Sequence, residues 1–195
     1  FITQVREGNA LLMRNLERAV ALLKNFRQVA ADQASEQRRD FDLQQVITEV
    51  VDTLKPSLKK KPHRVVQEIS PGITMDSYPG PLGQVIINLI NNAYLHAFDD
   101  ATPGQFTIRG EAHDNTVRLE FSDNGKGIAP AILEQMFEPF FSTKIGRGGT
   151  GLGMSIVENL VTKTLGGHLA VQSTVGRGTA ITITLPRHAP LQAEE

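Results

Sequence analysis

The sequence contains no cysteine among its 195 residues. Without cysteine the chain forms neither a disulfide framework nor a thiolate metal site, which excludes structural zinc and fits a reducing compartment. No run approaches the roughly 20 apolar residues that cross a bilayer, and residues 1–7 lack the order of a signal peptide. We therefore expect no direct membrane contact within this chain and a cytoplasmic location, although a longer parent protein could be anchored in the inner membrane.

The chain also lacks an excess of charge of either sign, because 20 Lys and Arg residues stand against 21 Asp and Glu residues. No sequence-wide electrostatic field draws such a chain to a polyanion, so we expect no nucleic-acid partner. A length of 195 residues suffices for one domain with a proper core and a smaller appendage. Two domains of full size would not fit.

Residues 8–35 lack proline and carry apolar side chains at alternating intervals of four and three. This spacing predicts one long helix with an apolar stripe made of Leu12, Leu16, Ala19, Leu23 and Phe26. The stripe suits a helical bundle, although a helix packed on its own domain would give the same pattern. A polar stretch over 32–40 reads as a linker. We therefore divide the chain into a helical segment with its linker (1–38), a main domain (39–188) and a C-terminal tail (189–195).

The main domain alternates between helical and strand periodicity. Asp42 precedes a helical pattern that loses its period at Pro56, and two more helices are predicted over 81–97 and 152–164. Strands are predicted at six places: 64–69 and 73–77 around a Pro71-Gly72 turn, 106–112 and 116–122 as a hairpin, 168–174, and 179–185. Helices combined with mostly antiparallel strands predict the α/β class, as a two-layer α/β sandwich.

Four polar side chains recur at intervals of four in the predicted helix over 81–97, namely Gln84, Asn88, Asn92 and His96. This interval places them along one side of the helix. Each unpaired buried amide costs on the order of 1 to 3 kcal/mol, so a buried helix with several amides on one side favours a polar ligand there. Helix capping and ordinary surface contacts would explain the same residues without a ligand.

Two glycine-rich stretches follow. Asp123 ends a strand before a turn through Gly125 and Gly127, where a carboxylate can accept a hydrogen bond from an exocyclic amine and the backbone can approach a flat ring. Residues 148–153 carry several glycines at a helix start, an arrangement suited to phosphates. No strand precedes the Gly146-x-Gly148-x-x-Gly151 pattern, so it is not a dinucleotide fingerprint, and the phosphate loop of the common ATPases is absent.

In this order, the stretches 84–96, 123–128, 137–144 and 148–153 resemble the N, G1, F and G2 boxes of the GHKL ATPase superfamily, and within it the catalytic domain of sensor histidine kinases. The resemblance covers about residues 41–187 and includes the closing Gly176-Arg177-Gly178-Thr179. It implies a Bergerat-type two-layer α/β sandwich, preceded by a long helix that resembles the second helix of a dimerisation and phosphotransfer hairpin. It also implies ATP and Mg²⁺, a homodimer formed through the N-terminal helix, and a response regulator as partner.

The resemblance assigns roles to individual residues. Asn92 matches the Mg²⁺ ligand, Asn88 the other amide that faces the phosphates, and Asp123 the carboxylate that reads adenine. Lys144 and Arg147 lie where lid cations could meet the phosphates, and Asn88, Asn92 and Lys144 are the expected catalytic residues. The remaining expected nucleotide-binding positions are His96, Gly125, Gly127, Ile128, Phe137, Gly149, Thr150, Gly151, Leu152, Gly153 and Thr179.

Hydrolytic members of the superfamily carry a glutamate four residues before the Mg²⁺ asparagine, where this chain has Asn88. A neutral amide cannot supply general-base assistance, worth roughly 10²- to 10⁴-fold, so we expect transfer of the γ-phosphoryl group and very slow hydrolysis. One departure is Leu95, where many members of the family carry a lysine that reaches the phosphates. Its absence would weaken ATP binding unless Lys144 or Arg147 compensates.

The histidine that would receive the phosphoryl group is not on the N-terminal helix, because the five histidines are His63, His96, His113, His168 and His188. The resemblance puts the acceptor on a first hairpin helix upstream of Phe1, for relay to a response regulator. His63 follows Pro62 in a predicted loop, where we expect it to be exposed. Three alternatives share the same domain: a serine-directed GHKL kinase, a hydrolytic GHKL ATPase, and a degenerate signalling module without activity.

Overall fold

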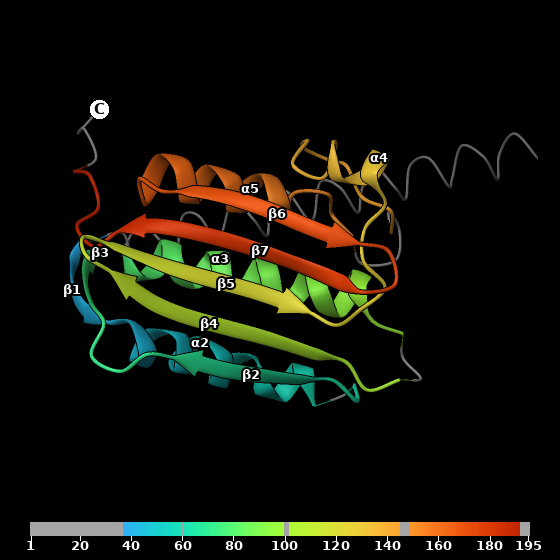
Figure 1. The fold of residues 1–195 in the computed structure, drawn as a ribbon, viewed down its shortest axis with the longest axis horizontal. Helices are drawn as coiled ribbons and strands as arrows, with labels where there is room; N and C mark the ends of the chain where they lie inside the picture. Colours follow the sequence, from blue (N-terminus) through green and yellow to red (C-terminus); the bar gives the residue numbers. More distant parts are fainter. Residues whose placement is uncertain (1–36, 60, 100–101, 145–148, 192–195) are drawn as a thin grey trace, which may run out of the picture.

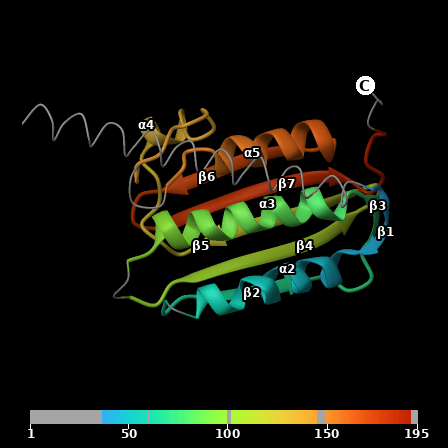
Figure 2. The same cartoon turned by 180° about the vertical axis from the view of Figure 1, so that it is seen from behind.

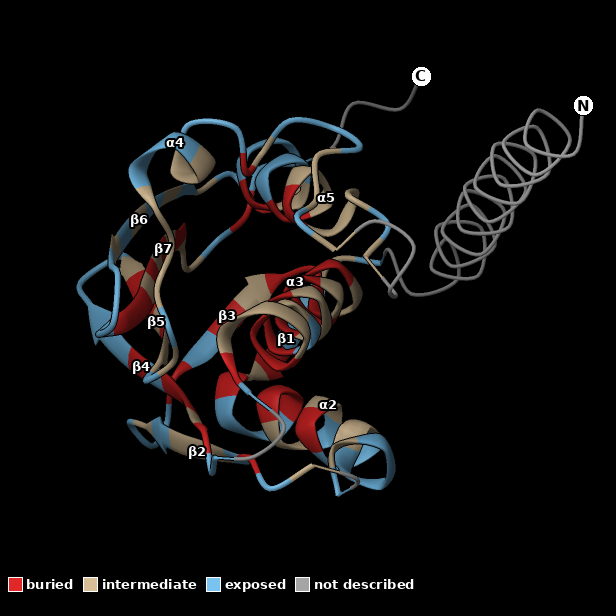
Figure 3. Cartoon of the chain, turned by 90° about the vertical axis from the view of Figure 1, so that its right-hand side faces the viewer, coloured by how far each residue is buried: buried red, intermediate tan, exposed pale blue. Residues whose placement is uncertain are grey.

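The computed structural model describes residues 37–59, 61–99, 102–144 and 149–191. The helix predicted over 8–35 lies outside these residues, so its dimerisation role stays a prediction. The described part has two layers, a curved sheet and a set of helices that covers only one of its faces (Figures 1 and 2). Buried residues gather between the two layers, while exposed residues lie on the outer sides of both (Figure 3). The predicted α/β sandwich is confirmed.

The main sheet has five strands, in the order β2, β4, β5, β7, β6. Strand β2 (Arg64–Ile69) is parallel to β4 (Gln105–His113), and the other neighbours, β5 (Thr116–Asp123), β7 (Gly178–Pro186) and β6 (His168–Thr174), pair antiparallel. The predicted hairpin is therefore present as β4 and β5, joined by the turn at 114–115. Residues that are register partners on neighbouring strands have their side chains on the same face of the sheet.

A second sheet has two strands, β1 (Arg39–Asp42) and β3 (Thr74–Ser77), which pair antiparallel. The two strands predicted on either side of the Pro71-Gly72 turn are present, but β2 and β3 belong to different sheets. Gly72 has a φ of 74°, a conformation that glycine adopts without steric cost. Strand β1 was not predicted, because the polar stretch Arg39–Asp42 has no apolar alternation and its pairing with β3 is a tertiary contact.

Helix α2 (Leu43–Leu58) begins as predicted, since the carboxylate of Asp42 accepts a hydrogen bond from the backbone N–H of Gln45 at 2.9 Å. The helix does not end at Pro56, as the loss of period indicated, but continues to Leu58. Pro56 lies within its last turn, and Leu54 and Leu58 pack against the core on either side of the proline. The apolar contacts of the helix therefore continue past Pro56, although proline has no backbone N–H to donate to the helix.

The other helices lie over the middle of the sheet. Helix α3 (Pro79–Asn92) begins two residues before the predicted start and continues as a π-helical turn, η1 (Ala93–Ala97). Helix α5 (Gly153–Asn159) likewise ends in a π-helical turn, η2 (Leu160–Thr164), and a short helix α4 (Pro130–Leu133) interrupts the loop between β5 and α5. The helix predicted over 152–164 is confirmed in extent. π-helical turns are often found at functional sites, and η1 is the one beside the cavity described below.

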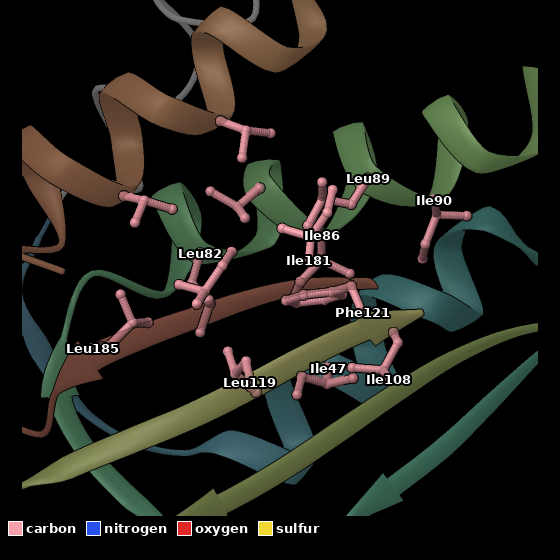
Figure 4. Packing of buried hydrophobic residues seen from close by; sticks show 14 of the residues in the cluster. Ile47, Leu82, Ile86, Leu89, Ile90, Ile108, Leu119, Phe121, Ile181 and Leu185 are labelled. Carbon is pink, nitrogen blue, oxygen red and sulfur yellow. The ribbon is translucent and has the colours of Figure 1, made fainter. Parts of the chain in front are cut away.

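The core lies between the helices and the inner face of the sheet (Figure 4). From α3, Ile86 and Ile90 are fully buried, and Leu119 and Ile183 are fully buried from the sheet. Strand β7 alternates strictly between buried and half-buried side chains from Thr179 to Pro186. This alternation puts Thr179 on the same face as Ile183, so a polar side chain at the end of the strand faces the helices.

The two ends of the described chain meet at Asp76 of β3. Its carboxylate accepts two hydrogen bonds from Arg38, at 2.8 and 2.5 Å, and its backbone pairs with Arg187 and Ala189. The bond from Arg38 is the main cause that lowers the pKa of Asp76 below its usual value. Ala189 is 2% exposed, so the C-terminal segment packs on the domain at this point. The predicted division at 38 and 188 stays a prediction.

None of the helices in the described ranges has the length and apolarity needed to span a membrane.

His63 was expected to be exposed, but it is buried, with only 8% of its surface accessible. Its ring packs against Tyr94 and Phe98, and its Nδ1 accepts a hydrogen bond from the backbone N–H of Gly104. The position of His63 in a loop after a proline was therefore a poor guide to its burial, which depends on contacts with residues distant in the sequence.

Candidate functional site

A cavity of about 450 Å³ lies where α3 and η1, the ends of β4, β5 and β7, and the loop after β5 converge. Eleven of the residues expected to bind a ligand line it: Asn88, Asn92, His96, Asp123, Gly127, Ile128, Gly149, Thr150, Gly151, Gly153 and Thr179. They come from sequence stretches nearly a hundred residues apart. The fold therefore brings the helix amides, the strand-end carboxylate and the second glycine stretch to one cavity.

Four expected positions do not line the cavity, and Arg147 lies outside the described residues. Gly125 packs so closely on η1 that a Cβ there would overlap the carbonyl of Ala97. Phe137 is partly buried against the core, and Leu152 is the residue that precedes α5. The fourth, Lys144, is engaged elsewhere, as described below. Their roles toward a ligand stay predictions.

One wall of the cavity carries Asp123 and Thr179, which are register partners on β5 and β7. Burial is the main cause that raises the pKa of the Asp123 carboxyl, while hydrogen bonds from the backbone N–H groups of Gly125 and Thr179 act in the opposite direction. The bond from Gly125 measures 2.8 Å. A partly desolvated carboxylate with remaining acceptor capacity is suited to a donor group of a ligand.

The loop after β5 is fixed on both sides. The backbone N–H of Lys126 donates to Ala97 at 2.9 Å, and the carbonyl of Lys126 accepts from Gly176 at 2.8 Å. Gly127 has a φ of 69°, and a Cβ there would overlap the carbonyl oxygen of Thr174, so only glycine fits. The backbone N–H of Ile128 donates to the hydroxyl of Ser173 at 2.8 Å. The loop is thus held as a preformed edge of the cavity.

Apolar side chains that were not assigned to the site complete the cavity wall. They are Leu89, Phe106, Phe121, Ile132, Met136, Phe141, Met154 and Ile181. The strand residues among them could have been found, because Phe121 and Ile181 share the inward phase of Asp123 and Thr179. Ile132 lies in the four-residue helix α4 and Met136 in the turn that follows it, and neither element is long enough to show a period in the sequence. Apolar walls with a few polar groups are typical of sites for flat organic ligands.

The helix side of the cavity presents amides. Asn88 accepts a hydrogen bond at Oδ1 from Gln84 at 3.3 Å, whereas its buried Nδ2 has no hydrogen-bond partner among the described residues. A buried amide donor without a partner costs free energy unless a ligand satisfies it. Asn92 lies one helical turn further along and is half-buried. The bond from Gln84 places the oxygen of the Asn88 amide toward Gln84 and its nitrogen on the other side.

A metal ion at these amides would need further ligands. No group of three or more His, Asp, Glu or Cys side chains within the described ranges could hold one. Mg²⁺ nevertheless binds through one or two protein oxygens when phosphates and water supply the rest of its octahedral shell. The amide oxygen of Asn92 fits that donor set, provided that a phosphorylated ligand is present.

The residues after Phe141 contact the end of η1. The ammonium group of Lys144 donates to the backbone carbonyl of Leu95, and the hydroxyl of Thr143 lies 3.2 Å from Nδ1 of His96. The pKa of His96 is lowered, first by burial and then by the charges of Lys144 and Lys126. His96 is therefore neutral near pH 7. In this arrangement the charge of Lys144 is directed to the helix end instead of the cavity.

The chain matches, over residues 78–189, the family described as "Histidine kinase-, DNA gyrase B-, and HSP90-like ATPase". It is 41% identical over 109 residues to the sensor histidine kinase ZraS of Salmonella typhi, an alignment that covers 55% of this chain and 22% of ZraS. The chain thus spans less than a quarter of that relative's length.

Two solved structures are similar at 26% sequence identity and a TM-score of 0.68. The catalytic domain of histidine kinase ThkA covers 78% of this chain, with 97% of its own length matched. Full-length ShkA in complex with AMPPNP covers 80% of this chain, with 32% of its own length matched. The likeness to an isolated catalytic domain confirms the Bergerat-type sandwich that the sequence resemblance implied.

Proposed function

Because the chain belongs to the family of histidine kinase-, DNA gyrase B- and HSP90-like ATPases, we propose that it is the ATP-binding kinase module of a sensor histidine kinase. In this proposal the cavity binds ATP with Mg²⁺, and the γ-phosphoryl group passes to a histidine on a dimerisation helix, for relay to a response regulator. The similar protein ShkA is described in complex with AMPPNP, an ATP analogue, which supports a nucleotide as the ligand.

The observation that carries the proposal is the polarity of the cavity. At one end Asp123 and Thr179 offer oxygen acceptors beside apolar side chains, which suits a flat ring that bears an amine. Along the helix the unpartnered Nδ2 of Asn88 offers a donor to an anionic oxygen. An adenine at the first end and phosphates at the second satisfy both sets of groups at once.

Asn92 is the proposed Mg²⁺ ligand. When bound, the metal supplies charge neutralisation of the phosphates and a fixed orientation of the transferred group. The chain's own residues do the rest: Asn88 donates to a phosphate oxygen, the glycines at 149–153 let the backbone approach the phosphates, and the apolar wall excludes water from the base. Lys144 reaches the phosphates only after it releases the carbonyl of Leu95.

The same amides favour transfer over hydrolysis. Activation of a water molecule needs a base, and no Asp or Glu other than Asp123 lines the cavity among the described residues. Asp123 belongs to the base-binding wall on the sheet, whereas the metal-binding amide lies on the facing helix. Asn88 and Asn92 are neutral, so general-base assistance of roughly 10²- to 10⁴-fold is missing for water. Phosphoryl transfer to an incoming imidazole depends instead on positioning and charge neutralisation.

The proposal is tested with the parent protein, which would include the acceptor helix, and with this chain alone. ATP labelled at the γ-phosphate should transfer its label to the parent as an acid-labile, base-stable phosphohistidine. This chain alone should bind ATP, remain unlabelled, and hydrolyse ATP very slowly. Label on serine, or turnover by this chain comparable to a dedicated ATPase, would contradict the proposal in favour of one of the two other enzyme classes. A chain that binds no nucleotide would contradict it altogether.

A further inference from the structure

A single cross-strand row runs across one end of the sheet. Phe106 on β4 pairs with Asp123 on β5, Asp123 pairs with Thr179 on β7, and Thr179 pairs with Ser173 on β6. All four residues share the inward phase of their strands, so their side chains face the helices. The first three line the cavity, whereas Ser173 lies at the end of the row, in contact with Thr179.

The hydroxyl of Ser173 has three hydrogen-bond neighbours. The backbone N–H of Ile128 lies 2.8 Å from it, the carbonyl oxygen of Gly178 lies at 3.0 Å, and the hydroxyl of Thr179 lies at 2.9 Å. A serine hydroxyl has one hydrogen and two lone pairs. The backbone N–H can only donate to it, and the carbonyl can only accept from it. Its second lone pair is then left for Thr179.

The single hydrogen of the Ser173 hydroxyl fixes the direction of its hydrogen bond with Thr179. If all three contacts are made at once, the hydroxyl of Thr179 donates to Ser173. The hydrogen of Thr179 is then directed along the row and away from the cavity, and a lone pair of its oxygen remains for a ligand. Asp123, on the adjacent strand, also presents lone pairs once ionised. The base-binding wall therefore accepts hydrogen bonds and donates none from these two side chains.

We infer that Ser173 is a positioning residue for base specificity, because it holds Thr179 as an acceptor and so selects a purine with a 6-amino group over a purine with a 6-oxo group. This inference rests on the proposed nucleotide site and adds to it a residue that does not touch the ligand. A 6-amine has two hydrogens to donate to two neighbouring acceptors, whereas a 6-oxo group brings a third acceptor to the same wall.

The rival explanation is that Ser173 only fixes the backbone at Ile128. The two roles predict different ratios of the affinities for ATP and ITP. Loss of a purely structural contact should weaken ATP and ITP by similar factors, because both share the bicyclic ring system, the ribose and the triphosphate and differ only in the 6-substituent and the hydrogen on N1. Loss of the orienting contact frees Thr179 to turn its hydrogen toward a 6-oxo group, so the ratio of the two affinities changes.

The experiment measures the Kd values of Mg²⁺-ATP and Mg²⁺-ITP by calorimetry for this chain and its Ser173→Ala variant. The preference for ATP should fall by roughly five- to tenfold in the variant, the value of about one hydrogen bond. Ser173→Thr keeps the hydroxyl and should retain the preference. Gln172→Ala is the matched control, since Gln172 is the preceding residue of β6 and its exposed side chain lies on the outer face.

A second pair of variants separates orientation from general damage. Thr179→Val removes the acceptor itself and should reduce the preference for ATP by a similar factor. In that background the further change Ser173→Ala should leave the ratio unaltered, because no hydroxyl remains to be oriented. Equal weakening of ATP and ITP by Ser173→Ala, or an effect on the ratio that persists without Thr179, would overturn the inference while leaving the proposed function intact. Failure of the unaltered chain to bind either nucleotide would overturn both.

Discussion

The two ends of the cavity are built in different ways. At the end proposed to bind the base, here the base end, strands β5, β6 and β7 carry Asp123, Ser173 and Thr179, and these groups are already joined by hydrogen bonds to one another or to the backbone. At the end proposed to bind the phosphates, here the phosphate end, the amide nitrogen of Asn88 has no partner among the described residues. The glycines that complete this end lie in loops and at the start of α5.

We expect this difference to separate recognition of the nucleotide from the chemistry of its phosphates. Groups that are fixed before binding discriminate between ligands, because they cannot reorient to suit a wrong one. Groups that lack partners before binding are satisfied only when charged oxygens arrive, so their contribution appears in the bound and reacting states. The base end should therefore decide which nucleotide binds, and the phosphate end should decide what happens to it.

The largest effect is expected from a substitution that alters the phosphate end alone. Asn92→Ala should lower phosphotransfer by the parent protein by about 10²- to 10³-fold, the usual loss when one electrostatic stabiliser is removed. Because the base end is intact, the affinity for ATP should change much less. The measurement is single-turnover labelling at saturating ATP, beside a binding titration. Asn159→Ala, which alters an exposed amide at the end of α5 away from the cavity, serves as the control.

The next largest effect is expected from a substitution that alters the base end alone. Asp123→Asn should weaken ATP binding by about 1 to 3 kcal/mol, or roughly 5- to 150-fold, because an amide turned to satisfy Gly125 cannot also accept from the base as a carboxylate does. Phosphotransfer at saturating ATP should change less than binding. Asp114→Asn, in the exposed turn between β4 and β5, is the matched control. Unchanged affinity in Asp123→Asn would remove this carboxylate from base recognition.

A smaller effect sharpens the comparison through pH. The pKa of Asp123 is raised in the free protein, mainly by burial, and a donor from the ligand would stabilise its ionised form. The ligand should thus lower this pKa, so the affinity for ATP should increase as pH rises through the raised value and then level off, at about tenfold per pH unit at most. Asp123→Asn should lose this dependence. A slope that persists in the variant belongs to another group, of which His96 is the nearest candidate.

The same group affects stability in the opposite direction. Since the folded-state pKa of Asp123 lies above its unfolded value, its contribution to stability is present at low pH and is lost as pH rises through the folded value. Ionisation of the Asp123 carboxyl therefore lowers the stability of the ligand-free protein. Bound ligand should offset this loss, so ATP should raise the thermal midpoint more at neutral pH than at acid pH.

The sequence predicted the parts of the site that follow from local pattern. Asp123 stood at a strand end and Asn88 on one side of a helix, and both line the cavity. Gly127 was expected at a turn, and its positive φ requires glycine. The fold class was likewise predictable, because four of the five strands of the main sheet, β4 to β7, carried their own alternation of apolar and polar residues.

What the sequence could not supply were contacts between segments far apart in the chain. Strand β1 exists through pairing with β3, and the burial of His63 through the rings of Tyr94 and Phe98. The contact of Lys144 with Leu95 joins residues 49 positions apart. Ser173 looked like one more polar residue on an alternating strand. Its relation to Thr179 became visible only once β6 lay beside β7.

The proposed function depends on one orientation of the nucleotide, in which the purine lies against the strands and the phosphates lie along the helix amides. A crystal structure of this chain with Mg²⁺ and a non-cleavable ATP analogue tests that orientation directly. We expect the 6-amine within hydrogen-bond distance of Asp123 and the metal coordinated by the side chain of Asn92. A base at the helix end with phosphates toward the strands, or a metal held away from Asn92, would contradict it.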